Sequence, residues 1–209
     1  MKKYLVEFIG MFLFVLTVGM VVIDPGGAGA LAPLAIGSVL MVLVYAGGHV
    51  SGGHYNPAVT LAVWLRGRCP TADVIPYWVS QILGAFLASQ VVLYLKGDHL
   101  ALPGDIRVVP SLIAEFIGTF ALAYVVLNVA TAKATAGNSN YGLAIGFTVV
   151  VMAFALGGVS GGAFNPAIAT GITLMHIEKI SNLWIYLAGD LAGAAVAALT
   201  FKFINPEDK

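Results

Sequence analysis

The sequence predicts an all-α membrane protein in which six spanning helices and two re-entrant half-helices form two inverted repeats. Hydrophobic residues make up 59% of the 209-residue chain and charged residues only 10%. A soluble domain carries about a quarter of its residues as charges, so lipid must be the solvent for much of this surface. Six apolar stretches approach the length of a bilayer span. Three sequence segments also recur, each once and at nearly one offset.

The first apolar stretch, residues 4–23, follows Lys2 and Lys3 and is interrupted by Glu7. A secretory signal peptide also places an apolar run after basic residues. This run is longer than a secretory core, and a close copy of the segment recurs in mid-chain. We therefore expect a spanning helix here.

The other predicted spans are 32–48, 75–95, 111–131, 140–157 and 183–204. Two further apolar pieces, at 56–65 and 165–175, are too short to cross about 30 Å of hydrocarbon. Each follows Ser-Gly-Gly and begins with Asn-Pro-Ala. Half-length helices approached through glycine-rich backbone are typical of re-entrant segments.

Basic residues predict the orientation of the chain. One side would carry Lys2, Lys3, Arg66, Arg68, Lys133, Lys202 and Lys209, and the other would carry Lys96, Arg107 and Lys179. Cytoplasmic loops carry the excess of Lys and Arg. We therefore expect both termini in the cytoplasm. Because no targeting signal is recognised, we expect the plasma or inner membrane.

The internal repeat spans most of the chain. The recurring segments are 7–10 with 115–118, 34–37 with 143–146, and 51–58 with 160–167. The offsets are 108 or 109 residues, so the chain is one transmembrane domain made of two homologous halves, about 1–100 and 108–209. Each half holds an odd number of spans, so the second half is inverted. Inverted repeats place their site at the midplane, between interrupted helices.

The two Asn-Pro-Ala motifs predict two helix starts that meet inside the bilayer. The motif residues are Asn56, Pro57, Ala58, Asn165, Pro166 and Ala167. Asparagine is a good N-cap and proline suits the first helical position. A capping asparagine accepts through its carbonyl, which leaves its NH₂ group to donate elsewhere. Two facing N-termini form a positive centre that water can approach with its oxygen and that opposes cations.

The segments before the motifs predict a track of hydrogen-bond acceptors. Glycine lets the backbone run extended along a cavity, so its carbonyls can face a passing solute. The expected carbonyls are those of Gly52, Gly53, His54, Gly161, Gly162 and Ala163.

The paired motifs and the repeated Glu-Phe-Ile-Gly resemble the aquaporin and aquaglyceroporin (major intrinsic protein) family over nearly the whole chain. The resemblance implies a right-handed bundle, usually a homotetramer with one pore per subunit, and passive passage of water or small neutral solutes. It also implies that Glu7 and Glu115 are buried and brace the re-entrant loops.

The resemblance breaks down at the constriction. Most family members carry arginine directly after the second motif, opposite an aromatic residue or histidine. Here the four matching positions are Ile36, Ala153, Gly162 and Ile168. An apolar constriction favours uncharged solutes. Besides water, polyols, ammonia, hydrogen peroxide, dissolved gas and a protonated small acid are therefore alternatives. A further alternative is that a side chain outside these four positions fills the space that the missing arginine leaves.

Other classes find less support. The single Cys69, and His49 and His54 without a third ligand nearby, do not form a metal site. No nucleophile, phosphate loop or cofactor motif is present, so we expect neither an enzyme nor a cofactor. Ten basic residues balance ten acidic ones, which argues against a nucleic-acid partner. A secondary transporter and a structural protein with a closed pore remain as alternatives.

Overall fold

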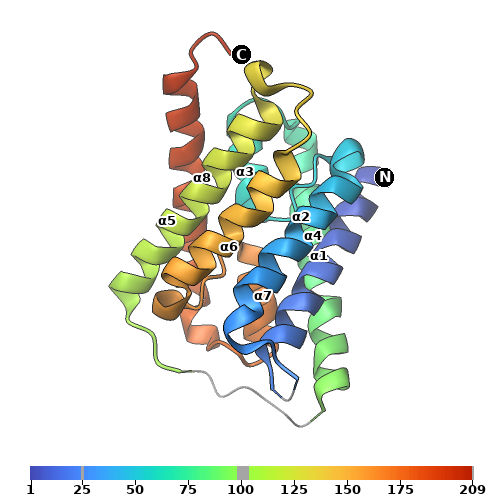
Figure 1. Ribbon diagram of the computed structural model, residues 1–209, viewed down its shortest axis with the longest axis vertical. Helices are drawn as coiled ribbons and strands as arrows, with labels where there is room; N and C mark the ends of the chain where they lie inside the picture. The colour runs from blue at the N-terminus through green and yellow to red at the C-terminus, as the bar shows by residue number, and fades with distance from the viewer. Residues whose placement is uncertain (25, 98–103, 209) are drawn as a thin grey trace.

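The computed structural model describes residues 1–24, 26–97 and 104–208. Its α-helices are α1 Lys2–Val22, α2 Ala32–Ser51, α3 Pro57–Leu65, α4 Thr71–Lys96, α5 Val108–Val126, α6 Tyr141–Ser160, α7 Pro166–Leu174 and α8 Leu183–Ile204. Three 3₁₀ turns lie at Gly29–Leu31, Lys133–Thr135 and Ile180–Asn182, and a π-helical turn at Leu127–Thr131 extends α5. The long helices run along the long axis, and both chain ends lie toward the same end of the bundle (Figure 1).

The six predicted spans are confirmed, with lengths of 20 to 26 residues and mean hydropathies of 1.5 to 2.5. The largest shift in a starting point is that of α4, which begins at Thr71 and not at residue 75. Asp73 lies in this extra turn. Its carboxylate accepts hydrogen bonds from Lys3 Nζ at 2.5 Å and from the Tyr4 hydroxyl at 2.7 Å. The acidic residue in the first turn of α4 is therefore partnered by α1.

The two half-helices are also confirmed. α3 and α7 contain nine residues each, which corresponds to about 14 Å at 1.5 Å per residue. That length is less than half of a bilayer core. Each half-helix therefore ends inside the bundle and relies on the long helices around it.

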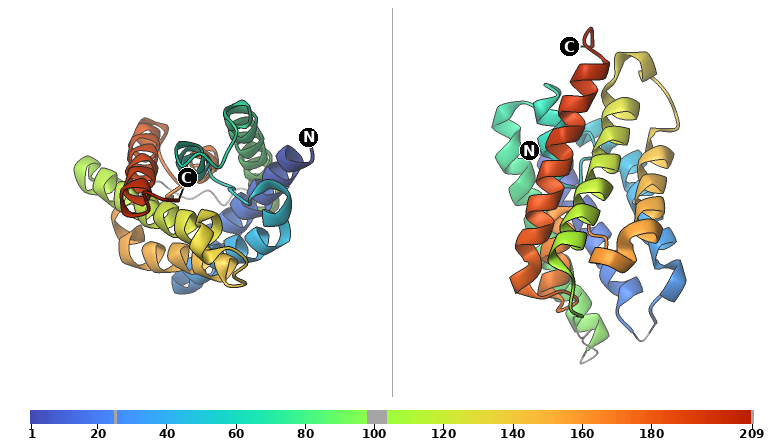
Figure 2. Two further views of the ribbon diagram at one scale, coloured as in Figure 1. Left: turned by 90° about the horizontal axis from the view of Figure 1, so that it is seen from above. Right: turned by 90° about the vertical axis from the view of Figure 1, so that its left-hand side faces the viewer.

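Helix packing follows the sequence repeat. α1 packs against α4 in the first half, and α5 packs against α8 in the second. α2 and α6 join the halves side by side, while α3 lies against α8 and α7 lies against α4. Each half-helix thus contacts a long helix of the other half, which interlocks the two repeats. Figure 2 shows this arrangement from above and from the side.

Glycine allows the closest of these crossings. Gly84 on α4 lies against the backbone carbonyl of Phe8, and Gly193 on α8 lies against that of Phe116. A methyl group at either glycine would collide with the carbonyl oxygen. Small residues at such contacts let transmembrane helices approach closely. The two contacts occupy equivalent places in the two halves.

The outer surface is apolar. On α4, Val79, Leu83 and Phe86 share one face and are about half exposed, as residues at i, i+4 and i+7 do. Polar side chains such as Glu7, Glu115 and Asp190 are instead fully buried. This distribution fits a protein whose solvent is lipid, and it places the polar groups around the axis of the bundle.

Candidate functional site

Asparagine caps the N-terminus of each half-helix. Asn56 Oδ1 accepts from the backbone N–H of Ala58 at 2.8 Å and of Val59 at 3.3 Å. Asn165 Oδ1 accepts from the N–H of Ala167 at 3.0 Å. The following prolines occupy the first helical position, where a missing N–H costs nothing. Both half-helices therefore begin where the motifs predict.

The two caps also bond across the interface between the repeats. Asn56 Nδ2 donates to the carbonyl of Phe164 at 2.9 Å, and Asn165 Nδ2 donates to the carbonyl of Tyr55 at 2.8 Å. The sequence predicts that each capping asparagine keeps its NH₂ group to donate elsewhere, and one amide hydrogen of each does so across this interface. The other hydrogen of each amide remains to donate to a solute.

Tyr55 and Phe164 adopt left-handed backbone conformations, with φ of 43° and 49°. Such angles are outliers for bulky residues and persist only where the surroundings enforce them. The conformation turns each carbonyl toward the opposing asparagine. Sequence reasoning missed both residues, although their place directly before each Asn-Pro-Ala was a signal.

Glutamate holds each of these segments from behind. Glu7 accepts from the Ser51 hydroxyl at 2.7 Å, from His54 N–H at 2.9 Å and from Tyr55 N–H at 2.6 Å. A carboxylate that accepts several backbone N–H bonds leaves the carbonyls of the same segment free to face elsewhere.

Glu115 has the same contacts in the second half. It accepts from the Ser160 hydroxyl at 2.5 Å, from Ala163 N–H at 3.1 Å and from Phe164 N–H at 2.6 Å. Both glutamates are fully buried, which is costly in a membrane without such partners.

The Glu-Phe-Ile-Gly repeat has a physical reason. Its glutamate and glycine are three residues apart and lie on the same helix face. While Glu7 holds the segment, Gly10 leaves space for the ring of Tyr55, which a methyl group there would strike. Gly118 does the same for the ring of Phe164. The motif therefore serves both the bonding and the packing of each loop.

The two halves differ in the polar residue that accompanies the buried glutamate. In the first half Gln81 Nε2 donates to Glu7 Oε2 at 2.8 Å and to Thr60 Oγ1 at 3.1 Å. Its counterpart in the second half is Asp190, which accepts from Thr119 Oγ1 at 2.8 Å. Asp190 therefore takes part in a hydrogen bond within the bundle. Its second oxygen has no partner among the described residues.

A cavity of about 120 Å³ lies between the halves on the side of α7. Both Asn56 and Asn165 line it, together with Ile36, Gly162 and Ile168. Four of the predicted carbonyl residues other than Gly162 also line it: Gly53, His54, Gly161 and Ala163. The structure therefore brings most of the candidate residues to one narrow space.

Ala153 does not line this cavity, whereas Ile145 and Val149 on the same face of α6 do. The side chain of Ala153 is a single methyl group, whereas Ile145 and Val149 carry longer side chains. Three of the four predicted constriction positions are thus found together, and the fourth is not.

A second and larger cavity, of about 760 Å³, opens on the side of α3. Gly52 lines this one, together with Arg68 and Lys133. His54 contributes to the walls of both cavities, and its Nδ1 lies 3.1 Å from Thr60 Oγ1. The imidazole therefore lies where the two spaces adjoin.

The wall near the motifs is mostly apolar. Ile168 is 4% exposed, and Val59 holds the matching place in the first repeat. Among the described residues that line the 120 Å³ cavity, none is lysine or arginine, and Glu178 is the one carboxylate. Sequence reasoning missed Glu178, because the connection that carries it has no counterpart in the paired motifs.

Two facing half-helices, held between interlocked inverted halves beside a narrow cavity, define a membrane channel for small solutes. The chain belongs to the major intrinsic protein family, whose model matches residues 1–201. It is a multi-pass channel for water, glycerol or similarly small neutral solutes, and not an enzyme.

Individual relatives agree with this assignment. Aquaporin NIP1-1 of Zea mays is 37% identical, over 100% of this chain and 76% of the relative. Glycerol uptake facilitator protein-like 6 of Lactiplantibacillus plantarum is 36% identical over 100% of both chains. The crystal structure of the aquaglyceroporin from Plasmodium falciparum shares the fold, with a TM-score of 0.79 at 22% identity, covering 98% of this chain and 95% of that one.

Proposed function

We propose that this channel passes uncharged solutes of the polyol type, as well as water, through an apolar constriction that lacks arginine. The observation that carries the proposal is the position of Ile168. It follows the second motif directly, is almost fully buried, and lines the cavity with Ile36 and Gly162. An isoleucine offers neither the charge nor the five donors of an arginine. The opening it leaves suits carbon-bearing solutes.

The polar half of the path is supplied by backbone and amide groups. The carbonyls of Gly53, His54, Gly161 and Ala163 are the proposed acceptors for solute hydroxyls, and their residues line the cavity. Asn56 and Asn165 each keep one amide hydrogen for the solute oxygen. A polyol can then bond along one side while its carbon atoms contact isoleucine on the other.

The passage of cations is opposed where the N-termini of the two half-helices meet. The N-termini of α3 and α7 both point there, and each carries roughly half a positive charge. A cation between them would lose its hydration shell without gaining a negative partner. Uncharged solutes avoid this cost.

The proposal also covers the orientation of the chain, its oligomeric state and its membrane. The excess of basic residues on the side of the two chain ends supports cytoplasmic termini. The family resemblance supports a homotetramer in a plasma or inner membrane. Among the alternatives to polyols, ammonia, hydrogen peroxide, dissolved gas and a protonated small acid also fit an apolar constriction, and the solute series below compares glycerol with ammonia and with a weak acid.

Stopped-flow light scattering on proteoliposomes tests the proposal, with water, glycerol, urea, ammonia and a weak acid in parallel. We expect fast water and glycerol flux, with a shallow temperature dependence and no need for an ion gradient. Flux that requires an ion gradient would indicate a transporter and overturn the proposal.

The substitution Ile168→Arg addresses the constriction directly. It should lower glycerol flux at least about tenfold while water flux persists, because it adds bulk and charge at the proposed constriction. Ile168→Leu, of equal volume and no charge, is the matched control and should keep glycerol flux. An unchanged solute profile in Ile168→Arg would disprove the role of Ile168.

A further inference from the structure

Glu178 places a carboxylate at the α7 end of the cavity. It lies between α7 and the turn Ile180–Asn182, is 8% exposed, and lines the same cavity as Ile168. Its equivalent in the first repeat, 109 residues earlier, is Cys69. The two ends of the channel are therefore chemically different at this position.

Three hydrogen bonds fix the carboxylate in place. Oε1 accepts from the Lys179 N–H at 2.6 Å and from Asn182 Nδ2 at 2.8 Å, and Oε2 accepts from the Tyr186 hydroxyl at 2.7 Å. An ionised carboxylate offers about four acceptor positions. One of them therefore remains available after these three bonds.

The charge of Glu178 has no cationic counterpart in the cavity wall. Lys179, its neighbour, directs its ammonium group to Asp105. No lysine or arginine belongs to the wall within the described ranges. With isoleucine directly after the second motif, Glu178 is the one carboxylate in a wall without lysine or arginine among the described residues.

The phenol of Tyr186 links Glu178 to the re-entrant loop. Its oxygen lies 2.7 Å from Glu178 Oε2 and 2.5 Å from the carbonyl of Ser160. Ser160 ends α6 and directly precedes Gly161 and Gly162, which line the cavity. Glu178 is thus held against the loop that forms the wall, and its charge acts on the space in front of it.

In a channel whose constriction lacks arginine, the positive ends of the two half-helices would attract anions unless a negative group opposes them. The facing N-termini of α3 and α7 repel cations, but helix N-termini also attract anions. A wall without any negative group would therefore let a small anion settle at the centre. A carboxylate in a poorly hydrated passage repels an approaching anion strongly, because little water screens it.

We infer that Glu178 is a specificity-determining residue that keeps anions out of the channel. The helix ends exclude cations and Glu178 excludes anions, so that only neutral solutes pass both. This inference rests on the proposed apolar constriction. It adds that solutes with a negative charge are rejected, and it names the residue that rejects them. It concerns small anions such as nitrate and the conjugate bases of small acids.

The test is the permeability of the full-length channel in proteoliposomes to nitrate, potassium and water. Glu178→Gln keeps the size of the side chain and removes its charge. The ratio of nitrate to water permeability should rise at least about tenfold, because the variant no longer repels the anion electrostatically. Potassium should stay excluded, because the helix ends are untouched.

Matched variants separate charge from structure. Glu178→Asp keeps the charge and should keep nitrate out. Glu207→Gln removes an exposed carboxylate outside the cavity and should change nothing. A purely structural role of Glu178 would lower water flux without changing the ratio of nitrate to water permeability.

An unchanged ratio in Glu178→Gln overturns the inference, as does an equal rise of potassium. Nitrate flux through the wild-type channel overturns it without any variant. Failure of the proposed function looks different: glycerol would then fail to permeate the wild type, whatever nitrate does.

Discussion

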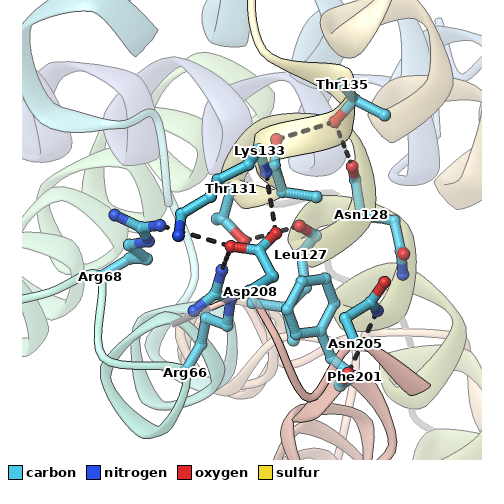
Figure 3. Close-up of polar contacts among 11 residues, drawn as sticks. Arg66, Arg68, Leu127, Asn128, Thr131, Lys133, Thr135, Phe201, Asn205 and Asp208 are labelled. Carbon is cyan, nitrogen blue, oxygen red and sulfur yellow. Dashed lines mark hydrogen bonds and ion pairs between the residues drawn. The ribbon is translucent and has the colours of Figure 1, made fainter.

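The guanidinium of Arg66 lies 2.6 Å from the carboxylate of Asp208 (Figure 3). Arg66 directly follows α3, and its side chain is 1% exposed. It also lies 4.5 Å from the ring centroid of Phe201 on α8. Asp208 in addition accepts from the backbone N–H of Lys133 at 2.8 Å. One carboxylate therefore ties the end of a half-helix to the connection between α5 and α6.

Asp208→Asn should destabilise the protein, because it leaves the buried Arg66 without a charged partner. We expect the melting temperature in detergent to fall by several degrees. Asp105→Asn is the control, since Asp105 is 93% exposed where it pairs with Lys179, and exposed pairs contribute little. Equal melting temperatures for the wild type and Asp208→Asn would show that Arg66 does not need this partner.

Acid should weaken the same contact. The hydrogen bond from the Lys133 N–H, together with the nearby Arg66, lowers the pKa of Asp208 below its ordinary value of 3.8. A lowered pKa in the folded state means that the contribution is complete above the ordinary value and is lost as the pH falls through the lowered one. The difference in melting temperature between the wild type and Asp208→Asn should therefore stay constant from neutral pH down to the ordinary value of 3.8 and shrink as the pH falls further. A difference that grows in acid would contradict this assignment.

Glu7→Gln should disrupt the first re-entrant loop. The amide has one acceptor oxygen in place of two, while Ser51, His54 and Tyr55 all donate to Glu7. Each buried donor left unpaired costs about 1–3 kcal/mol. Water permeability and thermal stability should both fall, as measured on the purified variant. Glu207→Gln, at an exposed position, should leave both unchanged; normal flux through Glu7→Gln would refute the bracing role.

Gly118→Ala should impair folding, because the added methyl group would strike the ring of Phe164. Gly157→Ala is a close control within another spanning helix, since nothing lies within 4 Å of the added atom. We expect the yield of monodisperse protein on size-exclusion chromatography to fall sharply for Gly118→Ala only. Similar yields for both variants would mean that the ring can move aside.

Much of the architecture could be predicted from the sequence because lipid imposes simple rules. Hydropathy located the six spans, and the caps Asn56 and Asn165 located the half-helices to within a residue of their starts. The start of α4 was placed four residues late, because hydropathy alone does not show that Asp73 in the first turn is partnered by Lys3 and Tyr4 of another helix.

The site was harder to predict where it depends on the reach of side chains. Spacing from a motif identifies a helix position, but it does not tell whether a methyl group such as that of Ala153 reaches the wall. The left-handed backbone at Tyr55 and Phe164 is likewise set by the surrounding contacts. Glu178 lies in an irregular connection, where periodicity carries no signal.

The reciprocal bonds of Asn56 and Asn165 have a consequence for how such a chain can arise. Each asparagine donates to the carbonyl that precedes the other, which is the pattern of an isologous contact between two identical subunits. A half-length ancestor could have made the same centre as a homodimer, provided that its copies were inserted in both orientations in one membrane. Fusion of two such copies into one chain would fix the antiparallel pairing and allow equivalent positions to differ, as Gln81 and Asp190 do.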